Sequence, residues 1–394
     1  MLLGLVGKPN SGKSSFFAGA TLVDVEIANR PFTTINPNKG VTYVRQKCPH
    51  VDFGLKECNP RNSKCEGGVR LIPINIIDVA GLVPDAHLGK GRGNAFLSDL
   101  NQADAFIQVV DVSGRTDLYG NESEQSDPGD EIEFLEKEIT YWIMGIVKKN
   151  WGKVRGKNID SLAEMLSGLR LTKQRIEAIA DKLKLAKERL AWTDEEMLSF
   201  ADEARKMTKP IVIAANKFDV PGAAENLAKL RERFPDMLII PTCAPAEIAL
   251  RKAAQKGVIK YTPGDKTFEL SEAAASSLDE KQKAGIASLK KIIEANEFGT
   301  GVQKVIDATV FEYLGLVAVY PVEDEHKFSN NFGHVLPDTF LVPKGTTALE
   351  FAGKIHTDLA ERFIGAINAR TRMRVGKDYL VQNGDVLKII AGGK

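Results

Sequence analysis

Eight residues close to the amino terminus have the types and the spacing that hold a phosphate chain. The segment Gly7-Lys8-Pro9-Asn10-Ser11-Gly12-Lys13-Ser14 has two glycines separated by four residues and followed by Lys and Ser. Glycines let backbone N–H groups turn towards phosphates, and a helix N-terminus adds positive potential. We expect Lys13 to reach the β- and γ-phosphates and the Ser14 hydroxyl to bind Mg²⁺. The other predicted contact residues of this phosphate loop are Gly7, Pro9, Asn10, Ser11, Gly12 and Ser15.

Two further segments could complete the phosphate end of the site. Asp78-Val79-Ala80-Gly81 follows the apolar run Ile74–Ile77, where a carboxylate can hold Mg²⁺ through water and the Gly81 N–H can meet the γ-phosphate. An Asp that only serves a turn explains this short motif equally well. Earlier in the chain, Pro31-Phe32-Thr33-Thr34-Ile35 offers a threonine that could close on Mg²⁺ and the γ-phosphate, and we favour Thr34. We therefore predict catalytic contacts from Lys13, Thr34 and Gly81.

A third segment carries information about the base. Asn216-Lys217-Phe218-Asp219 follows the apolar run Ile211–Ala215. An ionised Asp219 can accept hydrogen bonds from the N1–H and 2-amino groups of guanine, whereas adenine has neither donor and would leave the carboxylate unpaired. Asn216 would brace the loop, and Lys217 would lie over the base. The pattern predicts a guanine nucleotide, GTP or GDP.

The next strand end provides the last predicted contact. In Pro241-Thr242-Cys243-Ala244, small residues allow the backbone N–H groups of Cys243 and Ala244 to approach the 6-oxo group of guanine. Small residues end many strands, so this segment alone is weak evidence.

These segments need a scaffold that brings strand ends together. Short apolar runs, separated by helical stretches, have the length and branching of buried parallel strands: Leu2–Val6, Ile74–Ile77, Ala105–Val110, Ile211–Ala215 and Met237–Ile240. A helix is predicted to begin at Lys13. The alternation predicts a doubly wound α/β domain of the P-loop NTPase class, over residues 1–305, whose ligands bind beyond the carboxyl ends of the strands.

Two insertions interrupt this predicted domain. Residues 45–70 contain three cysteines among Pro, Gly and Asn, which predicts an irregular loop or a small excursion from the domain. Residues 130–205 read as a helical, coiled-coil insertion: Ile159–Ala191 has helical apolar spacing and would form half of an antiparallel pair. Trp192-Thr193-Asp194 would form the turn and N-cap before another helix.

Residues 306–394 are predicted to form a small α+β domain. The expected strands are Val317–Val322, Thr339–Val342, Tyr379–Val381 and Val386–Ile390, with a helix over Ala348–Ile364 and a tight turn at Asn383-Gly384-Asp385.

The composition of the chain limits which binding partners and which cellular compartment we expect. The 394 residues are 43% hydrophobic and 27% charged, as in globular proteins. Lys plus Arg number 53 against 52 for Asp plus Glu, so no global charge draws the chain to nucleic acid or lipid. The first apolar stretch is too short for a signal peptide, and no run approaches the roughly 20 residues that span a bilayer. We expect a cytoplasmic protein, without membrane contact and monomeric.

Four soft metal ligands gather in the first insertion, namely Cys48, His50, Cys58 and Cys65. No two of the cysteines have the short spacing usual for structural zinc, so the sequence favours free thiols over a zinc site.

With these residues in view, the chain resembles the translation-factor class of GTPases, and within it the Obg-related YchF-like group. The marks are Pro31-Phe32-Thr33-Thr34 followed by Asn36-Pro37-Asn38, and Asp78-Val79-Ala80-Gly81-Leu82-Val83-Pro84 leading to Gly89-Lys90-Gly91-Arg92-Gly93-Asn94. The segments around Val375–Tyr379 and Gly384–Val386 look like a TGS domain, which implies a ubiquitin-like (β-grasp) fold. The family also has a helical insertion at the position of residues 130–205.

The resemblance implies a ribosome or another RNA-bound partner. The residues Arg370, Arg372, Arg374 and Lys377 could then form an RNA-binding patch, although a solvated positive face explains them equally well.

Two positions modify the expected chemistry. Some relatives prefer ATP, but Asp219 keeps the guanine-reading residue. Leu82 stands where many switch GTPases have a water-orienting Gln, so hydrolysis must use another group. The resemblance suggests K⁺ held partly by Asn10, and His87 could position water, although a solvated loop histidine explains it equally well. The leading hypothesis is a GTPase switch; the alternatives are a nucleotide-gated binding module with incidental hydrolysis, and an ATPase.

Overall fold

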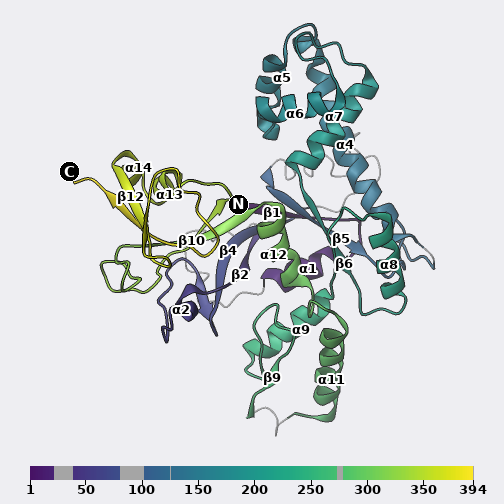
Figure 1. Ribbon diagram of the computed structural model, residues 1–394. Helices are drawn as coiled ribbons and strands as arrows, with labels where there is room; N and C mark the ends of the chain where they lie inside the picture. Colours follow the sequence, from purple (N-terminus) through teal and green to yellow (C-terminus); the bar gives the residue numbers. More distant parts are fainter. Residues whose placement is uncertain (22–38, 80–101, 125, 273–277, 394) are drawn as a thin grey trace. The chain divides into compact units, whose positions relative to one another are not determined.

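The chain divides into two compact units in the computed structural model (Figure 1), which describes residues 1–21, 39–79, 102–124, 126–272 and 278–393. The first unit comprises Met1–Thr42 and Asn75–Val305, and the second comprises Tyr43–Ile74 and Ile306–Lys394. The observed division differs from the predicted boundary at residue 305 in one segment, because residues 43–74 pack with the carboxyl-terminal part of the chain.

A parallel sheet forms the centre of the first unit, as predicted. β1 pairs in parallel with β4 and β5, β5 with β6, and β6 with β7. The full order is β2-β4-β1-β5-β6-β7, with β3 paired antiparallel to β4; β3 and the parts of β2 and β4 within residues 43–74 belong to the second unit. The strands are β1 (Leu2–Val6), β2 (Lys39–Lys47), β3 (Lys64–Glu66), β4 (Val69–Asp78), β5 (Ala105–Asp111), β6 (Ile211–Asn216) and β7 (Ile239–Pro241). All five predicted strands occur.

Helices follow the strands of this sheet. They are α1 (Lys13–Thr21), α8 (Ala223–Arg233), α9 (Ala244–Gln255), α11 (Glu280–Ala295) and α12 (Val302–Ala308), which continues into the π-helical turn η4 (Thr309–Tyr313). A short pair of strands, β8 (Ile259–Lys260) and β9 (Glu269–Leu270), lies between α9 and α11.

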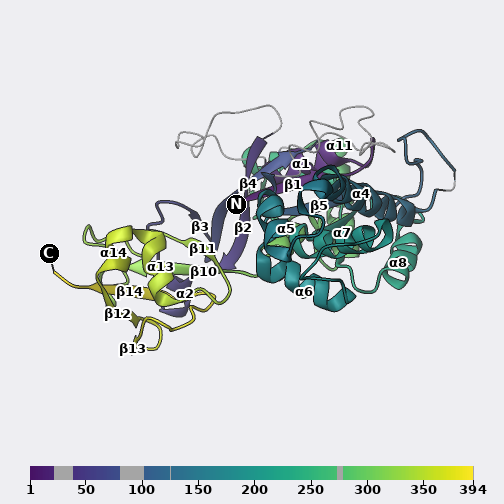
Figure 2. The same ribbon diagram turned by 90° about the horizontal axis from the view of Figure 1, so that it is seen from above.

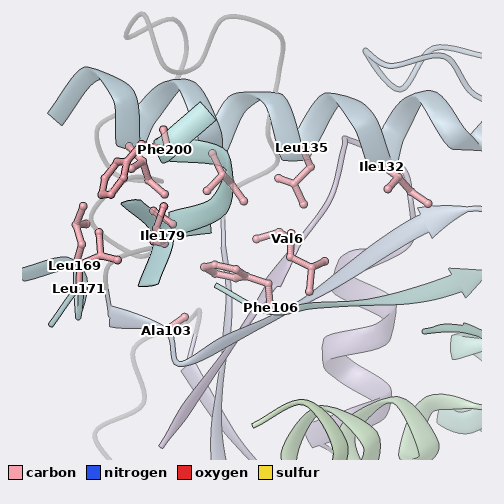
Figure 3. Close-up of a cluster of buried hydrophobic side chains, with 14 of the residues drawn as sticks. Val6, Ala103, Phe106, Ile132, Leu135, Leu169, Leu171, Ile179 and Phe200 are labelled. Atoms are coloured by element: carbon pink, nitrogen blue, oxygen red, sulfur yellow. The ribbon is translucent and has the colours of Figure 1, made fainter. Parts of the chain in front are cut away.

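The predicted helical insertion is present and lies beyond one end of the sheet (Figure 1). It contains α4 (Pro128–Val154), α5 (Ile159–Leu166), a 3₁₀ turn η3 (Ser167–Leu169), α6 (Lys173–Leu183) and α7 (Asp194–Thr208). The apolar face of α4 packs over the sheet: Figure 3 shows Ile132 and Leu135 above Val6 and Phe106. Burial of this continuous apolar face fixes the insertion to the parallel sheet.

The prediction of one helix over Ile159–Ala191 is wrong. Arg170 (φ 58°) and Lys184 (φ 57°) adopt left-handed backbone conformations, which end η3 and α6. Thr172 caps α6 by accepting a hydrogen bond from the Arg175 N–H. The periodic apolar residues therefore face one core from two short helices and not from one long helix. The N-cap predicted within Trp192-Thr193-Asp194 is confirmed and is Thr193, which forms a capping box with Glu196.

The second unit contains a five-stranded sheet in the order β11-β10-β14-β12-β13. The strands are β10 (Leu316–Val322), β11 (Phe340–Pro343), β12 (Phe363–Asn368), β13 (Met373–Val375) and β14 (Val386–Ala391), and the helices are α13 (Ala348–Ile355) and α14 (Thr357–Glu361). Figure 2 shows α13 and α14 on one side of this sheet. Gly384, with φ 84°, forms the predicted turn before β14.

Three sequence predictions in this unit need correction. The predicted helix Ala348–Ile364 stops at an extended His356 (φ −161°, ψ 141°), and β12 begins at Phe363. Tyr379–Val381 is not an extended strand, because Leu380 forms only a single isolated antiparallel bridge, with Thr347. Residues 45–70 are not simply irregular: they contain the end of β2, the short helix α2 (Pro49–Asp52) and β3.

Replacement of Phe351 by Ala should destabilise the second unit by about 3–5 kcal/mol, because the Phe351 side chain is fully buried and the variant leaves a cavity. The matched control is Phe332→Ala, whose side chain is 82% exposed and should change stability by no more than about 0.5 kcal/mol. The stability changes of both variants can be measured from the urea dependence of hydrogen exchange in peptides from residues 306–394. Equal effects would contradict the assigned core.

Candidate nucleotide-binding site

The predicted phosphate loop lies between the carboxyl end of β1 and the first turn of α1. Two of its glycines are required by close approach: a Cβ on Gly7 would lie 2.5 Å from the Val109 carbonyl oxygen, and one on Gly12 would lie 2.1 Å from Asn216 Nδ2. Gly12 and Asn10 also have positive φ angles, of 91° and 61°. The loop is therefore held in a turn that points its backbone towards the helix N-terminus, where phosphate groups bind.

The oxygen ligands predicted for Mg²⁺ lie together. Ser14 Oγ is 3.2 Å from Asp78 Oδ2, and Lys13 Nζ is 3.6 Å from Asp78 Oδ1. That second carboxylate oxygen is buried and accepts no hydrogen bond from any described residue. A hydroxyl and a carboxylate oxygen fit the preference of Mg²⁺ for hard ligands, and the cation would neutralise phosphate charge here. Thr34 and Gly81 lie outside the described residues.

Asn216 links the phosphate loop to the two base-reading loops. Its side-chain Nδ2 donates to the Ser11 carbonyl at 3.1 Å, and its Oδ1 accepts from the backbone N–H of Ala244 at 3.2 Å. The side chain is almost fully buried at the end of β6. One amide therefore fixes the distance between the phosphate end and the base end of the site.

The predicted base-reading residues come together at the ends of β6 and β7, but the backbone N–H groups of Cys243 and Ala244, predicted to face the guanine 6-oxo group, donate to the Thr300 carbonyl and to Asn216 Oδ1. The backbone N–H of Phe218 donates to the Thr242 carbonyl at 3.1 Å, which joins the two loops. Asp219 is exposed and lies beside the Cys243 thiol. Burial raises the pKa of Cys243 to about 12, and the Asp219 carboxylate contributes to this increase. The Cys243 thiol therefore stays neutral at pH 7.

Asp111, at the end of β5, is a site residue that the sequence analysis missed. Lys217, with φ 64°, donates from Nζ to Asp111 Oδ2 at 2.7 Å. Asp111 is fully buried and also accepts from the hydroxyls of Ser113 and Thr116. Burial acts to raise the pKa of Asp111, but Lys217 and the hydroxyls outweigh it, so this pKa lies below the usual value. The sequence did contain a signal for Asp111: like Asp78, it is a carboxylate directly after a predicted strand.

A second missed feature is a buried ion pair under the phosphate loop. Lys8 Nζ lies 2.8 Å from Glu131 Oε1, and both side chains are at most 4% exposed. Lys8 also donates to the Thr116 carbonyl at 2.5 Å, and Glu131 accepts from the Asp111 N–H at 3.3 Å. Burial raises the pKa of Glu131 to about 7, against the opposing effect of the Lys8 ammonium. The pair connects the phosphate loop to β5 and to the first turn of α4.

The segment after β5 also covers part of the phosphate loop. Asn10 Nδ2 donates to the Gly120 carbonyl at 2.9 Å, and a Cβ on Gly120 would lie 2.8 Å from Pro9. This contact orients Asn10, the residue suggested for K⁺, and it explains why glycine is needed at position 120.

Comparison with protein families agrees with this geometry. Residues 2–149 match the family described as 50S ribosome-binding GTPase, residues 214–324 match "Obg-like GTPase YGR210-like, G4 motif-containing domain", and residues 332–391 match the TGS domain. Within the described residues, none of the helices combines the length and apolarity that crossing a bilayer requires.

The chain is similar to several relatives along its whole length. A GTP-binding protein of Methanocaldococcus jannaschii is 47% identical over 100% of both chains. The ribosome-binding ATPase YchF of Bacillus subtilis is 28% identical, covering 98% of this chain and 97% of its own. The crystal structure of a GTP-binding protein from Pyrococcus horikoshii OT3 superposes with a TM-score of 0.79, at 38% identity and with 100% of both chains covered.

A phosphate loop at the end of the first parallel strand, tied through Asn216 to an Asn-Lys-x-Asp loop, defines the P-loop GTPase class. Together with the carboxyl-terminal TGS domain and the similarity over full length, these features show that the chain belongs to the YchF/Obg-like family of GTPases.

Replacement of Lys8 by Met should destabilise the first unit by about 3–5 kcal/mol, because it leaves the Glu131 carboxyl group buried without its partner. The double variant Lys8→Met/Glu131→Leu should recover most of this loss, since it removes both charges. The control Lys148→Met breaks an exposed pair with Asp194 and should cost no more than about 1 kcal/mol. Thermal unfolding measures all three. A double variant as unstable as Lys8→Met alone would contradict the assigned pair.

Proposed function

We propose that this chain is a Mg²⁺-dependent GTPase that hydrolyses GTP to GDP and phosphate and acts as a conformational switch on ribosomes or another RNA-bound partner. The observation that carries the proposal is the position of Asn216, which holds the phosphate loop and the base-reading loops in one site. A site preorganised at both ends binds the nucleoside and the triphosphate together.

The phosphate end would work mainly by electrostatic stabilisation. Lys13 would contact the β- and γ-phosphates, while Ser14 and Asp78 would hold Mg²⁺, directly or through water. The Asp78 carboxylate supports this role, because its Oδ1 accepts no hydrogen bond from the described residues and only the Lys13 ammonium, at 3.6 Å, compensates its charge. Thr34 and Gly81 would add contacts to Mg²⁺ and the γ-phosphate when the nucleotide is a triphosphate.

Hydrolysis would need a group other than a glutamine, because Leu82 follows Gly81. A leucine side chain cannot orient water by hydrogen bonding. We propose that K⁺ near the β–γ bridge, held partly by Asn10, stabilises the charge that develops in the transition state. His87 is the alternative candidate for positioning water.

The choice between GTP and ATP depends on Asp219. The Bacillus subtilis relative is named an ATPase, so an adenine nucleotide is the competing substrate. In this chain, the exposed Asp219 carboxylate stands beside the Cys243–Ala244 loop, where it can accept from two guanine donors. Adenine offers neither donor, which favours GTP.

The wild-type protein should bind GTP at least roughly 150-fold more tightly than ATP, since losing two hydrogen bonds to a charged group costs about 3 kcal/mol or more. Asp219→Asn should lose this preference and favour xanthosine triphosphate. Calorimetry with the three nucleotides and Mg²⁺ measures the affinities, with Asp236→Asn, an exposed carboxylate on the loop before β7, as the control. Tighter binding of ATP than GTP by the wild type would rule out the guanine assignment.

A basic edge of the second unit supports an RNA-bound partner. Arg372, Arg374 and Lys377 are exposed on or next to β13, the edge strand of its sheet. Arg370 is different: its guanidinium contacts Asp52 at 2.9 Å and the Gly384 carbonyl at 2.6 Å, so its main role is internal. The 50S ribosome-binding family description and the name of the Bacillus subtilis relative agree with a ribosomal partner. A cytoplasmic monomer fits this role.

Ribosomes should accelerate single-turnover GTP hydrolysis, and the acceleration should be greater in KCl than in NaCl. Arg372→Glu/Arg374→Glu should weaken ribosome binding and reduce its salt dependence, because fewer phosphate contacts release fewer counterions. Lys281→Glu/Lys291→Glu reverses the same number of charges on α11 and serves as the control. Stimulated hydrolysis supports the switch. Hydrolysis that ribosomes leave unchanged, together with GTP-dependent ribosome binding, would favour a nucleotide-gated binding module.

A further inference from the structure

Four metal-ligating side chains of the second unit converge on one point. They are Cys48, which follows β2, His50 in α2, Cys58 in the following loop and Cys65 in β3. Their ligand atoms all lie within 4.8 Å of one another. The spacing of the cysteines in the sequence had favoured free thiols. In the structure, β3 pairs antiparallel with β4, and Cys65 in β3 lies next to the turn that contains Cys48 and His50.

The distances inside this cluster fit a tetrahedral ion. Cys48 Sγ is 3.8 Å from Cys58 Sγ, and Cys65 Sγ is 3.7 Å from His50 Nδ1. A tetrahedral zinc with Zn–S bonds of about 2.3 Å and Zn–N bonds of about 2.0–2.1 Å separates two sulfurs by about 3.8 Å, and a sulfur and a nitrogen by about 3.6 Å. A disulfide between Cys48 and Cys58 would require sulfurs about 2.05 Å apart. The cluster therefore has the dimensions of a metal centre and not of a disulfide.

The charge around the cluster also fits a metal thiolate centre. Arg70 is completely buried and is the cross-strand partner of Cys65. Its guanidinium lies 3.8 Å from Cys58 Sγ and donates to Ser63 Oγ and the Leu336 carbonyl. No carboxylate among the described residues forms an ion pair with Arg70. Zn²⁺ with three thiolates and one neutral imidazole carries one negative charge, which Arg70 would neutralise.

The surrounding loop is fixed to the rest of the second unit. The backbone N–H groups of Asn59 and Arg61 donate to the Val335 and Pro337 carbonyls, and Asn62 exchanges two hydrogen bonds with the backbone of Thr339. An ion in the cluster would cross-link the segments that begin this loop and end it. Cys58, Cys65 and His50 also line an open hollow of about 410 Å³, which gives an ion a path to the ligands.

We propose that Cys48, His50, Cys58 and Cys65 form a structural Cys₃His zinc site that cross-links residues 48–66 of the second unit. All four coordination positions are filled by protein, which is the arrangement of structural and not catalytic zinc. The site is independent of the nucleotide chemistry proposed above.

The first measurement is the metal content of the full-length protein, produced without a polyhistidine tag in zinc-supplemented medium. Elemental mass spectrometry of the purified protein should find one zinc ion per chain. A thiol-specific mercurial reagent should release that zinc, detected with a metallochromic indicator, and the thermal unfolding temperature should fall. After an excess of a small thiol has removed the mercurial from the cysteines, the unfolding temperature should recover on addition of zinc but not magnesium. Wild-type protein that contains no zinc, or that contains iron in its place, would overturn the proposal even if no variant folds.

Ligand variants provide the second measurement. Since substitutions around a metal centre weaken binding about 10- to 100-fold even outside the ligand set, Cys58→Ser and His50→Ala should each lower zinc affinity at least tenfold. Cys243→Ser is the matched control, because Cys243 is a buried free cysteine outside the cluster, and it should retain one zinc. Full zinc content in Cys58→Ser, or its loss in Cys243→Ser, would show that the ion binds elsewhere.

Discussion

The arrangement of the nucleotide site depends on one buried amide, the side chain of Asn216. It bonds the Ser11 carbonyl on one side and the Ala244 N–H on the other, so the ends of β1, β6 and β7 keep a constant separation. Parallel pairing makes this possible, because neighbouring strands finish at the same edge of the sheet. A Cβ on Gly12 would displace the amide, so the glycine and the asparagine have to occur together.

Two buried ion pairs also support the loops of the nucleotide site. Asp111 holds Lys217 in its left-handed conformation, and Glu131 holds Lys8 beneath the phosphate loop. Glu131 belongs to α4, the first helix of the insertion, so the insertion contributes a side chain to the support of the nucleotide site. Any change in the position of α4 must alter this pair, which gives the insertion a physical connection to the phosphate loop.

The second unit uses different means to order a segment that has little regular structure. Residues 48–66 pair with the backbone of residues 335–339, stack Phe53 on Phe328 with centroids 3.9 Å apart, and bring four metal ligands together. Its sheet leaves basic side chains on the edge strand β13, where unpaired backbone groups and positive charge face solvent. An ordered loop and a basic edge are thus built on one small domain.

The sequence by itself determined the parallel strands, the order of the nucleotide-binding segments and the family, because these depend on local apolar runs and on residues adjacent in the chain. It also located the cap at Thr193 and the turn at Gly384. It did not determine where helices stop, since Arg170, Lys184 and His356 end them by backbone conformation against an apolar pattern that continues. Only the tertiary structure decided that Asp111 meets Lys217, that Glu131 meets Lys8, and that Cys48, His50, Cys58 and Cys65 share one point. Those meetings depend on how strands and loops distant in the chain pack together, and residue spacing contains no record of that packing.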